Sequence, residues 1–573
     1  MNQYAAKVSV LFLVTIFLSF ACTTDSTEAS DAADMVLFNG KIITVDESNR
    51  EVQAIAIKGD KIVALGTDAE IKSRIGPVTK TIDLNGQLAI PGFNEGHGHF
   101  MGIGASKMML DLTKPKNWDE IVQMVADAAK EAKPGEWIIG RGWHQDKWDK
   151  APDPAVEGLP VLDGLSKVSA DNPVILTHAS GHGSFVNAKA LELAGIDSKT
   201  ADPPGGEILR DKDGRPTGFL RETAQRIVSS ANKGPSTDAE RLDIARKQAE
   251  LASREVLSKG ITTFHDAGSG FETIDLFKKL VDEGKLPLRL WVMIRASNEE
   301  LAEKLKNYRV IGYGNNHLTV RAIKLSIDGA LGSRGAWLLE PYTDAPRSRG
   351  LNLIPVESAE KTAGLAIQND YQLCIHAIGD RANKEVLDIF EETFKANPDK
   401  KVLRWRVEHA QHLNPADIPR FGKLGVVASM QGVHCTSDAS WVPDRLGDKR
   451  SEEGAYVWQK LMKSGALVTN GTDAPVEDVS PIASFYSTVS RKLKDGSVFY
   501  PEQRMSRVEA LRSYTINVAK SGFEEELKGS LEVGKLADIT ILSKDIMAVK
   551  EDEIPTAEVL YTIVGGKIAY QKG

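Results

Sequence analysis

The sequence predicts an α/β protein whose core is an eight-stranded (β/α)8 barrel, and three observations lead to this fold class. Eight short apolar segments, each followed by a polar turn, are spread over residues 87–475. Helical patterns alternate with them, such as the stretch 238–260 that closes on Gly260. Several segments end in histidine, lysine or aspartate, and such a barrel places its chemistry where strands end.

The predicted strands follow one another along the chain with helical stretches between them. In chain order they are QLAIPGF (87–93), GITTFHDAG (260–268), LPLRLWVMI (286–294), VRAIKLSIDG (320–329), YQLCIHAIGD (371–380), LRWRVEHAQH (403–412), LGVVASMQG (424–432) and ALVTNGTDAP (466–475). Segments of this length with β-branched residues and polar turns favour strands over helices. Alternation with helices then favours a parallel sheet closed into a barrel.

Two histidines, His97 and His99, stand one residue apart after the first strand, in a chain that holds only 11 histidines. In an extended segment, side chains at i and i+2 point to the same side, so both imidazoles can converge on one point. Neutral imidazole is a common ligand of zinc. A histidine pair also occurs in ordinary polar loops, so the metal interpretation depends on partners elsewhere.

Four further residues supply those partners at other strands. Lys324 lies in the fourth strand, His376 and His409 end the fifth and sixth, and Asp473 ends the eighth. Taken singly, each has a plainer interpretation: a hydrogen-bonded core histidine, a snorkelling lysine or a turn aspartate. Because strand ends meet at one end of a barrel, their joint occurrence predicts a metal site.

The chain resembles the amidohydrolase superfamily, and within it the N-substituted formamide deformylase-like (amidohydrolase 3, YtcJ-like) branch. The resemblance covers the chain from about residue 35 onward and depends on many motifs in the right order: PGFNEGHGH, GRGWHQDKW, DPPGGEILRDKDGRPTGFLRE, KLSIDGALGSRGAW, HAIGDRANKEVLD, RVEHAQHL, SMQGVH, GTDAPVE and GSLEVGKLADITIL. One departure is Glu95, where the family more often carries aspartate. The longer carboxylate keeps the charge but can alter the support of the first histidine.

The resemblance implies one or two divalent metal ions, with Zn²⁺ as the first choice. His97 and His99 would hold one metal, His376 and His409 the other, and Asp473 would act as ligand and catalytic base. Two cations in a low-dielectric barrel need an anion between them, which Lys324 would supply if its neutral amine became an N6-carboxylated carbamate. An unmodified Lys324 beside a single metal is the alternative. The expected reaction is hydrolysis of an amide-like, non-peptide C–N bond of a small molecule by a metal-activated hydroxide.

Other polar and aromatic residues are candidates for binding the substrate. Asp328 and Arg334 follow the fourth strand, His434 follows the seventh, and His182 lies in the long insertion after strand one. Arg334 could bind a carboxylate or pair with a loop acid. Trp143 and Trp148 could line a pocket, although a buried structural tryptophan is commoner.

The domain organisation follows from the flanks of the barrel. Residues 1–21 have Lys7, an apolar run and then Ala21-Cys22, which is typical of a lipoprotein-type signal peptide; Ser19 departs from the usual leucine and leaves ordinary cleavage open. Residues 22–34 would be a flexible tether. We expect residues 35–87 and 521–573 to form one β-sandwich, as in the resembled family, and residues 88–520 to form the barrel. An insertion at about 100–260 would lie over the catalytic face.

Composition narrows the remaining functions. The net charge is −8 and no run is rich in lysine or arginine, which argues against a nucleic-acid partner. We expect a small-molecule substrate, membrane contact only through a lipid on Cys22 at the periplasmic face of a bacterial membrane, and leave a homodimer open. Two rival functions are the same metal site acting on an ester, lactone or phosphoester, and a non-enzymatic solute-binding lipoprotein.

Overall fold

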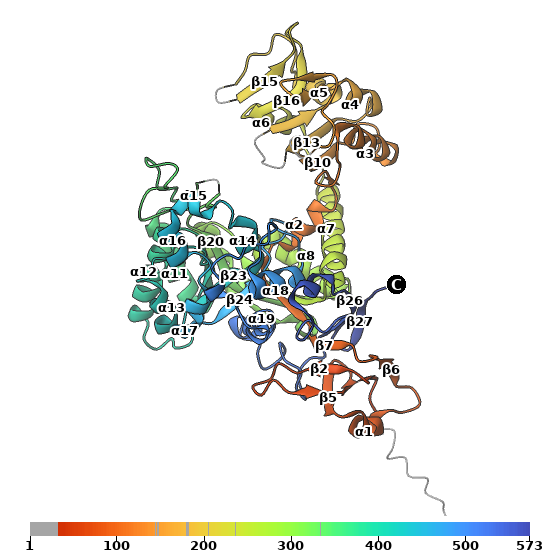
Figure 1. Ribbon diagram of the computed structural model, residues 1–573, viewed down its shortest axis with the longest axis vertical. Helices are drawn as coiled ribbons and strands as arrows, with labels where there is room; N and C mark the ends of the chain where they lie inside the picture. The colour runs from red at the N-terminus through yellow and green to blue at the C-terminus, as the bar shows by residue number, and fades with distance from the viewer. Residues whose placement is uncertain are drawn as a thin grey trace, which may run out of the picture.

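The structure, a computed structural model, describes residues 32–143, 145, 148–178, 183–203, 206–234, 237–332 and 334–573. Three parts follow one another along its long axis: an insertion with its own sheet, a barrel and a β-sandwich (Figure 1). Within the described ranges, no helix has the length and apolar character needed to cross a membrane. Cys374 and Cys435 are buried free thiols, as the apolar sequence around them predicts.

The barrel is a nearly closed ring of eight parallel strands, so the predicted fold class is confirmed. Seven of the predicted segments contain a barrel strand, and the strand that follows the first segment supplies the eighth. Its strands are β8 (Phe93–Gly98), β17 (Ile261–Ser269), β18 (Arg289–Ile294), β20 (Leu318–Ser326), β21 (Gln372–Ala377), β22 (Arg406–His409), β23 (Val427–Gln431) and β24 (Val468–Gly471). The first and last strands meet where the Asp473 amide donates to the His97 carbonyl at 2.8 Å and the His99 amide donates to the Ala474 carbonyl at 2.7 Å.

Helices surround this ring because one face of each carries apolar residues. They include α8 (Phe271–Asp282), α9 (Asn298–Tyr308), α11 (Val356–Gln368), α12 (Asp380–Ala396), α13 (Ile418–Leu424), α14 (Gly432–Asp438), α15 (Val442–Leu446), α16 (Asp448–Gly454), α17 (Trp458–Lys463), α18 (Pro481–Ser490), α19 (Arg507–Ser513) and α20 (Ile516–Ser521). In α12, Ala382, Val386 and Phe390 recur every four residues and are buried in the main core.

Alternation along the strands decides which side chains enter the barrel. In β20, Ala322 packs in a small inner cluster with Trp291, Met293 and Cys374, whereas Ile323 packs in the outer core against the helices. Because the side-chain period of a strand is two, Lys324 shares the inner face with Ala322. The alternation of side chains along β20 therefore places the amine of Lys324 inside the barrel.

The β-sandwich is built from both ends of the described chain. One sheet has the order β5-β4-β1-β6 and the other β27-β26-β25-β7-β2-β3. Their bounds are β1 (Met35–Phe38), β2 (Lys41–Ile43), β3 (Glu51–Val52), β4 (Ala54–Lys58), β5 (Lys61–Gly66), β6 (Lys80–Asp83), β7 (Leu88–Pro91), β25 (Ile539–Leu542), β26 (Val559–Val564) and β27 (Lys567–Gln571). Apolar residues of both sheets form one core.

The boundary between sandwich and barrel differs from the prediction. We expected the sandwich piece to end at residue 87 and the first barrel strand to begin there. Instead Leu88–Pro91 pairs with β2 and β25 inside the sandwich, and the barrel strand begins at Phe93. One apolar run therefore serves two sheets, and His97 lies inside a strand, one residue before its end.

The insertion forms an α/β unit of its own between α2 (Phe100–Ser106) and α7 (Asp238–Ser258). Its sheet has the order β15-β16-β14-β13-β10-β9, covered by helices. The elements are β9 (Leu110–Asp111), α3 (Trp118–Glu131), β10 (Ile138–Trp143), α4 (Asp163–Val168), β13 (Val174–His178), β14 (Gly183–Val186), α5 (Ala188–Ala194), β15 (Gly206–Arg210), β16 (Pro216–Glu222) and α6 (Gln225–Ala231).

The insertion stands clear of the barrel in Figure 1 rather than lying across it. Its two connections are held together because α2 packs tightly on α7: a Cβ added at Gly104 would lie 1.9 Å from the Gln248 carbonyl oxygen. Helix α7 leads into the start of β17, so its own beginning lies at the opposite end of the barrel. The insertion therefore leaves from the end where the strands terminate.

Candidate metal centre

Three ligand-type side chains converge at the carboxyl ends of the strands. One ligand atom each from His97, His409 and Asp473 lies within 4.8 Å of the others, and all three residues are buried. They come from β8, the end of β22 and the turn after β24, which neighbour one another only because the barrel closes. A set of two imidazoles and a carboxylate is a donor set that zinc-type ions accept.

Asp473 lies between the two histidines of the first strand. Its Oδ1 is 3.1 Å from His99 Nε2 and 3.5 Å from His97 Nε2. Among the described residues, this oxygen is buried without a well-directed hydrogen bond. Burial alone would raise the pKa of Asp473, but the close contact with His99 and the other nearby imidazoles hold it well below the ordinary value. The carboxylate is therefore charged and points at the shared centre.

Lys324 enters the same centre from β20. Its Nζ lies 3.4 Å from His97 Nε2, and the residue is only 2% exposed. Burial lowers the pKa of this amine, although Glu408 and Asp473 oppose the shift. A neutral amine at this place is compatible with carboxylation, which needs the unprotonated nitrogen.

His376 and His409 lie side by side on β21 and β22, with ring centres 4.3 Å apart. His409 Nδ1 is 2.7 Å from Gln431 Oε1, which leaves Nε2 available as a ligand. His376 Nε2 is buried, lies 3.5 Å from Asp328 Oδ1 and makes no hydrogen bond to any described residue. A buried nitrogen of this kind is a suitable ligand for a metal ion.

Three of the imidazoles, those of His97, His376 and His409, are held neutral by the low-dielectric surroundings. Burial lowers the pKa of His97 to about 4 and that of His376 to about 3. The pKa of His409 lies well below the ordinary value for the same reason, with His376 and His97 adding to the shift. Metal ligation needs the unprotonated ring, so the site is prepared to accept a cation near neutral pH.

A buried charge pair that the sequence analysis missed orients His97. Glu408 Oε2 is 2.5 Å from His97 Nδ1, and Arg406 Nε donates to Glu408 Oε1 at 2.7 Å. This leaves His97 Nε2 pointing to the centre, the arrangement that carboxylates commonly impose on ligating histidines. A signal existed: opposite charges two residues apart in a strand buried on both faces must share one side of it.

Glu95, in the first barrel strand β8, is hydrogen-bonded to the turn that follows the last barrel strand, β24. Its Oε1 accepts a hydrogen bond from the Thr472 amide at 2.5 Å, while Oε2 is buried without a partner among the described residues. Burial raises the pKa of Glu95 to about 8, so the group is protonated at neutral pH. Glu95 thus supports the chain between Asp473 and His97 and is not a ligand.

The four predicted substrate residues do not share one environment. Asp328 accepts hydrogen bonds from the amides of Trp337, Ile378 and Gly379 and is 1% exposed, so it positions the turn after His376. Arg334 is paired with Asp344 at 2.8 Å, away from the ligands. His434 does lie near the centre, with its ring stacked 6.4 Å from that of His409. His182 falls outside the described residues.

The two tryptophans belong to the core of the insertion. Trp143 is fully buried, donates to the Leu176 carbonyl and stacks on Trp148.

A residue that the sequence did not single out, Arg295, lies at the end of β18 beside the metal centre. Gly268 separates it from Lys324, since a Cβ there would lie 3.1 Å from Arg295 Cδ and 3.6 Å from Lys324 Cγ. Its Nη2 donates to Ser326 Oγ at 3.1 Å.

Comparison with known proteins agrees with this geometry. A family model described as "Amidohydrolase family" matches residues 80–570. The chain is 30% identical to the putative amidohydrolase YtcJ of Bacillus subtilis, over 93% of this chain and 98% of that protein. It is 35% identical to the protein LONG AFTER FAR-RED 3 of Arabidopsis thaliana, over 95% of this chain and 92% of that protein.

A more specific name appears among the other relatives. The N-substituted formamide deformylase of Arthrobacter pascens is 26% identical over 94% of this chain and 98% of that enzyme. Among solved structures, an uncharacterized metal-dependent hydrolase from Pyrococcus furiosus matches with a TM-score of 0.71 and 27% identity, covering 90% of this chain and all of that one. Family model, relatives and site geometry agree, and the chain is a member of the amidohydrolase family with the fold of a metal-dependent hydrolase.

Proposed function

We propose that this metal-dependent hydrolase cleaves an amide-type C–N bond, other than a peptide bond, in a small molecule. The observation that carries the proposal is the convergence of buried, neutral imidazoles and one charged carboxylate on a single point at the end of the barrel. The bond type is supported by the similarity to an N-substituted formamide deformylase.

The donor set fits a divalent ion, and zinc is our first choice. When bound, a divalent metal lowers the pKa of a water molecule and polarises the carbonyl group of a substrate. His97, His99 and Asp473 would hold one ion, and His376 and His409 a second. Lys324, carboxylated on Nζ, would supply the anion between them; a single ion beside an unmodified Lys324 is the alternative.

Asp473 is the group in this site that can move a proton. Its Oδ1 faces the centre and makes no well-directed hydrogen bond within the described residues. As water adds to the carbonyl carbon, Asp473 accepts a proton from that water. It then passes the proton to the nitrogen as the C–N bond breaks, so the products are a carboxylic acid and an amine.

Arg295 and His434 would contact the rest of the substrate. Arg295 is exposed at the mouth of the barrel beside Lys324, and it forms no ion pair with any described residue. A guanidinium in this place would hold a carboxylate or another negative substituent of the substrate. His434 Nε2 is buried without a hydrogen-bond partner in the part of the chain described, so it can donate to or accept from a bound molecule.

The test combines metal analysis with a substrate screen. The purified protein should contain one or two divalent ions per chain, and it should hydrolyse compounds from a panel of N-formyl and N-acyl amides. Esters, lactones and phosphoesters are screened in parallel. Faster cleavage of one of those classes would replace the proposed bond type, and a metal-free protein that binds solutes without turnover would support the solute-binding alternative.

We further propose that the chain is exported and carried as a lipoprotein at the periplasmic face of a bacterial membrane. The support is the sequence of residues 1–22 alone, because residues 1–31 lie outside the described structure. Mass spectrometry of the mature protein from its native host should find a chain that begins at a lipid-modified Cys22. An intact Met1 would contradict export with processing.

A further inference from the structure

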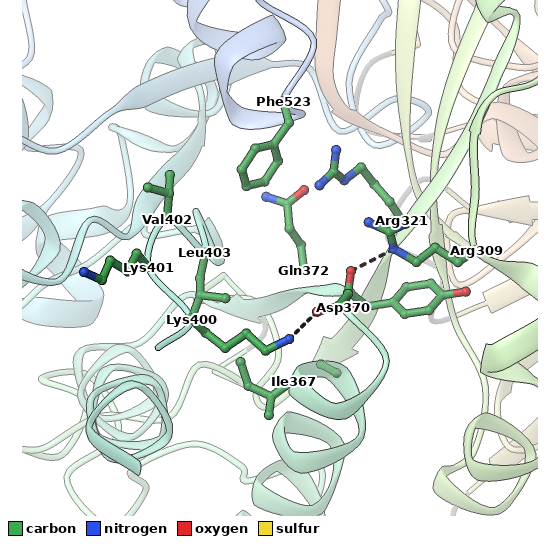
Figure 2. Close-up of a pocket in the computed structure, with 12 residues that line it drawn as sticks. Arg309, Arg321, Ile367, Asp370, Gln372, Lys400, Lys401, Val402, Leu403 and Phe523 are labelled. Atoms are coloured by element: carbon green, nitrogen blue, oxygen red, sulfur yellow. Dashed lines mark hydrogen bonds and ion pairs between the residues drawn. The ribbon is translucent and has the colours of Figure 1, made fainter. Parts of the chain in front are cut away.

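A polar cavity lies at the end of the barrel where the strands begin, opposite the metal centre. It has a volume of about 250 Å³. Arg321 reaches it from the first half of β20, Gln372 is the first residue of β21, and the turn 400–403 leads towards β22. Phe523, just after α20, forms one wall (Figure 2). None of these residues belongs to the metal centre.

The cavity is lined by more positive than negative charge. Arg309, Arg321, Lys400 and Lys401 line it together with a single carboxylate, that of Asp370. Asp370 is already paired with Lys400 at 2.5 Å, and its carbonyl oxygen accepts from Arg309 Nε at 3.0 Å. Within the described residues, no carboxylate of the cavity is therefore left to neutralise Arg321.

Arg321 is held in place without an anionic partner. Its guanidinium lies 4.2 Å from the centre of the Phe523 ring, and the same ring is contacted by Arg404 at 4.5 Å. Arg404 uses both Nη atoms on Glu525, at 3.0 and 2.6 Å. Arg321 Nε is buried and makes no hydrogen bond to any described residue. Burial, together with Arg309 and Arg404, lowers the pKa of Arg321 to about 10, although Glu524 and Glu525 oppose the shift from nearby.

Gln372 presents an unused acceptor to the same cavity. Its Nε2 donates to the carbonyl oxygens of Arg404 at 2.7 Å and Ser521 at 2.9 Å, and these bonds fix which way the amide faces. Its Oε1 is buried and accepts from no donor that the structure describes. Figure 2 shows the ends of Arg321 and Gln372 turned toward each other beneath Phe523. The cavity thus offers a fixed cation next to a fixed acceptor.

We propose that this cavity is a binding site for a phosphate group, separate from the metal centre. Phosphate oxygens would accept from Arg321, and the remaining P–OH of hydrogen phosphate would donate to Gln372 Oε1. Phosphate at neutral pH has both the negative charge and the hydroxyl that these two groups require. Sulfate has the same shape and charge but carries no proton at neutral pH, so it would leave Gln372 unsatisfied.

The test uses the full-length, metal-loaded protein and isothermal titration with three probes: inorganic phosphate, sulfate and glycerol phosphate. Wild-type protein should bind inorganic phosphate, and sulfate about tenfold more weakly, which corresponds to about 1.4 kcal/mol for the buried acceptor that sulfate leaves unpaired. Glycerol phosphate decides the source: binding tighter than phosphate indicates a phosphorylated metabolite, and no binding indicates free phosphate. Equal affinities for phosphate and sulfate would overturn the role of Gln372.

Variants separate this cavity from phosphate bound at the metal centre. Arg321→Gln should weaken the phosphate site at least tenfold and abolish the rise in melting temperature that phosphate produces. Arg254→Gln, the same change at an exposed arginine of α7, should behave like wild type. Arg321→Lys keeps the charge and guards against a folding defect; it should bind phosphate with intermediate affinity. Unchanged phosphate binding in both Arg321 variants would overturn the proposal.

Discussion

The two ends of the barrel are built from the same strands but are prepared for opposite charges. At the carboxyl end, burial lowers the pKa values of His97, Lys324 and His376, and His376 Nε2 makes no hydrogen bond to any described residue, an arrangement that suits cations. At the amino end, Arg321 remains charged, half-buried and without an ion pair to any described residue, which suits an anion. Arg321 and Lys324 are three residues apart on β20.

The difference shows that burial alone does not decide what a polar side chain does. Arg289, also at the amino end of the barrel, is as buried as the ligands, yet Asp538 satisfies it with bonds of 2.7 and 2.9 Å. It is the unsatisfied groups that mark a site, because a buried polar atom without a partner costs free energy that a ligand can recover. The predictions below test this distinction.

The largest effect is expected from removing the lysine of the carboxyl end. Lys324→Ala should lose bound metal and activity together, since the proposed anion between the ions disappears. Small carboxylic acids added to the variant should restore part of the turnover. Metal content and rate are compared with those of Lys247→Ala, an exposed lysine of α7. Two bound ions and full turnover in Lys324→Ala would refute the bridging role.

The next largest effect should follow from Asp473→Asn. Asparagine keeps the size of the side chain and tolerates the left-handed backbone found there, with φ of 57°. It cannot accept a proton, so we expect kcat to fall about a hundredfold or more while substrate affinity survives better. Steady-state kinetics with parallel metal analysis checks this. An active, metal-replete variant would reduce Asp473 to a turn residue.

A smaller effect on metal binding is expected from Glu408, which contacts His97 on the side away from the metal centre. Glu408→Gln removes the charge that faces His97 Nδ1 and Arg406, and metal affinity should fall by about 10- to 100-fold. Competition with a chelating dye measures that affinity. Unfolding of the metal-free proteins serves as control, because loss of a buried charge also destabilises the fold. Unchanged metal affinity would mean that Gln431 and the chain alone orient the histidines.

Substitutions at the amino end of the barrel should change the stability of the fold and have almost no effect on turnover. Asp538→Asn leaves Arg289 buried and unpaired, which costs about 3–5 kcal/mol. Arg321→Gln removes a charge that has no partner, so the unliganded protein should lose little or no stability. Thermal unfolding of both variants without phosphate makes the comparison. Equal destabilisation would show that Arg321 has a structural partner after all.

The same pair predicts an acid-sensitive joint between the sandwich and the barrel. Although burial opposes it, Arg289 lowers the pKa of Asp538 below the ordinary 3.8. A depressed carboxyl pKa adds stability that is complete above 3.8 and is lost as the pH falls from there towards the folded-state value. Melting temperatures of wild type and Asp538→Asn should therefore converge only below about pH 4. A constant difference down to pH 2 would contradict this linkage.

The fold was largely readable from the sequence because strand ends carry recognisable patterns. Seven of the eight barrel strands were located, and His97, His99, Lys324, His376, His409 and Asp473 lie at one end of the ring. Their roles as ligands and base stay predictions. The boundary near Gly92 was misplaced because one continuous apolar run enters two different sheets, and a period-two pattern does not record which sheet each half joins.

The roles of Arg334, Asp328 and Glu408 depend on the partners that the fold brings to each of them. For Arg334 the sequence left open a substrate carboxylate or a loop acid, and the structure pairs it with the loop residue Asp344. Asp328 looked available to a substrate, yet backbone amides near His376 occupy it. Glu408 was passed over because its role depends on His97, 311 residues earlier. The fold of the barrel brings the partners of Asp328 and Glu408 together, although Arg406 and Glu408, two residues apart in one buried strand, gave a local signal for the second.

The sandwich also has a consequence for how the protein is made. Lys41 of β2 bonds to Asp545, which lies 504 residues later. Strand β7 pairs with β2 along one edge, and its other edge has no partner until β25 has been synthesised. At about 5–20 residues per second, a ribosome needs roughly 25–100 seconds to span that distance. For most of this time β7 presents an unpaired apolar edge, and any chain truncated before residue 539 would keep that edge open.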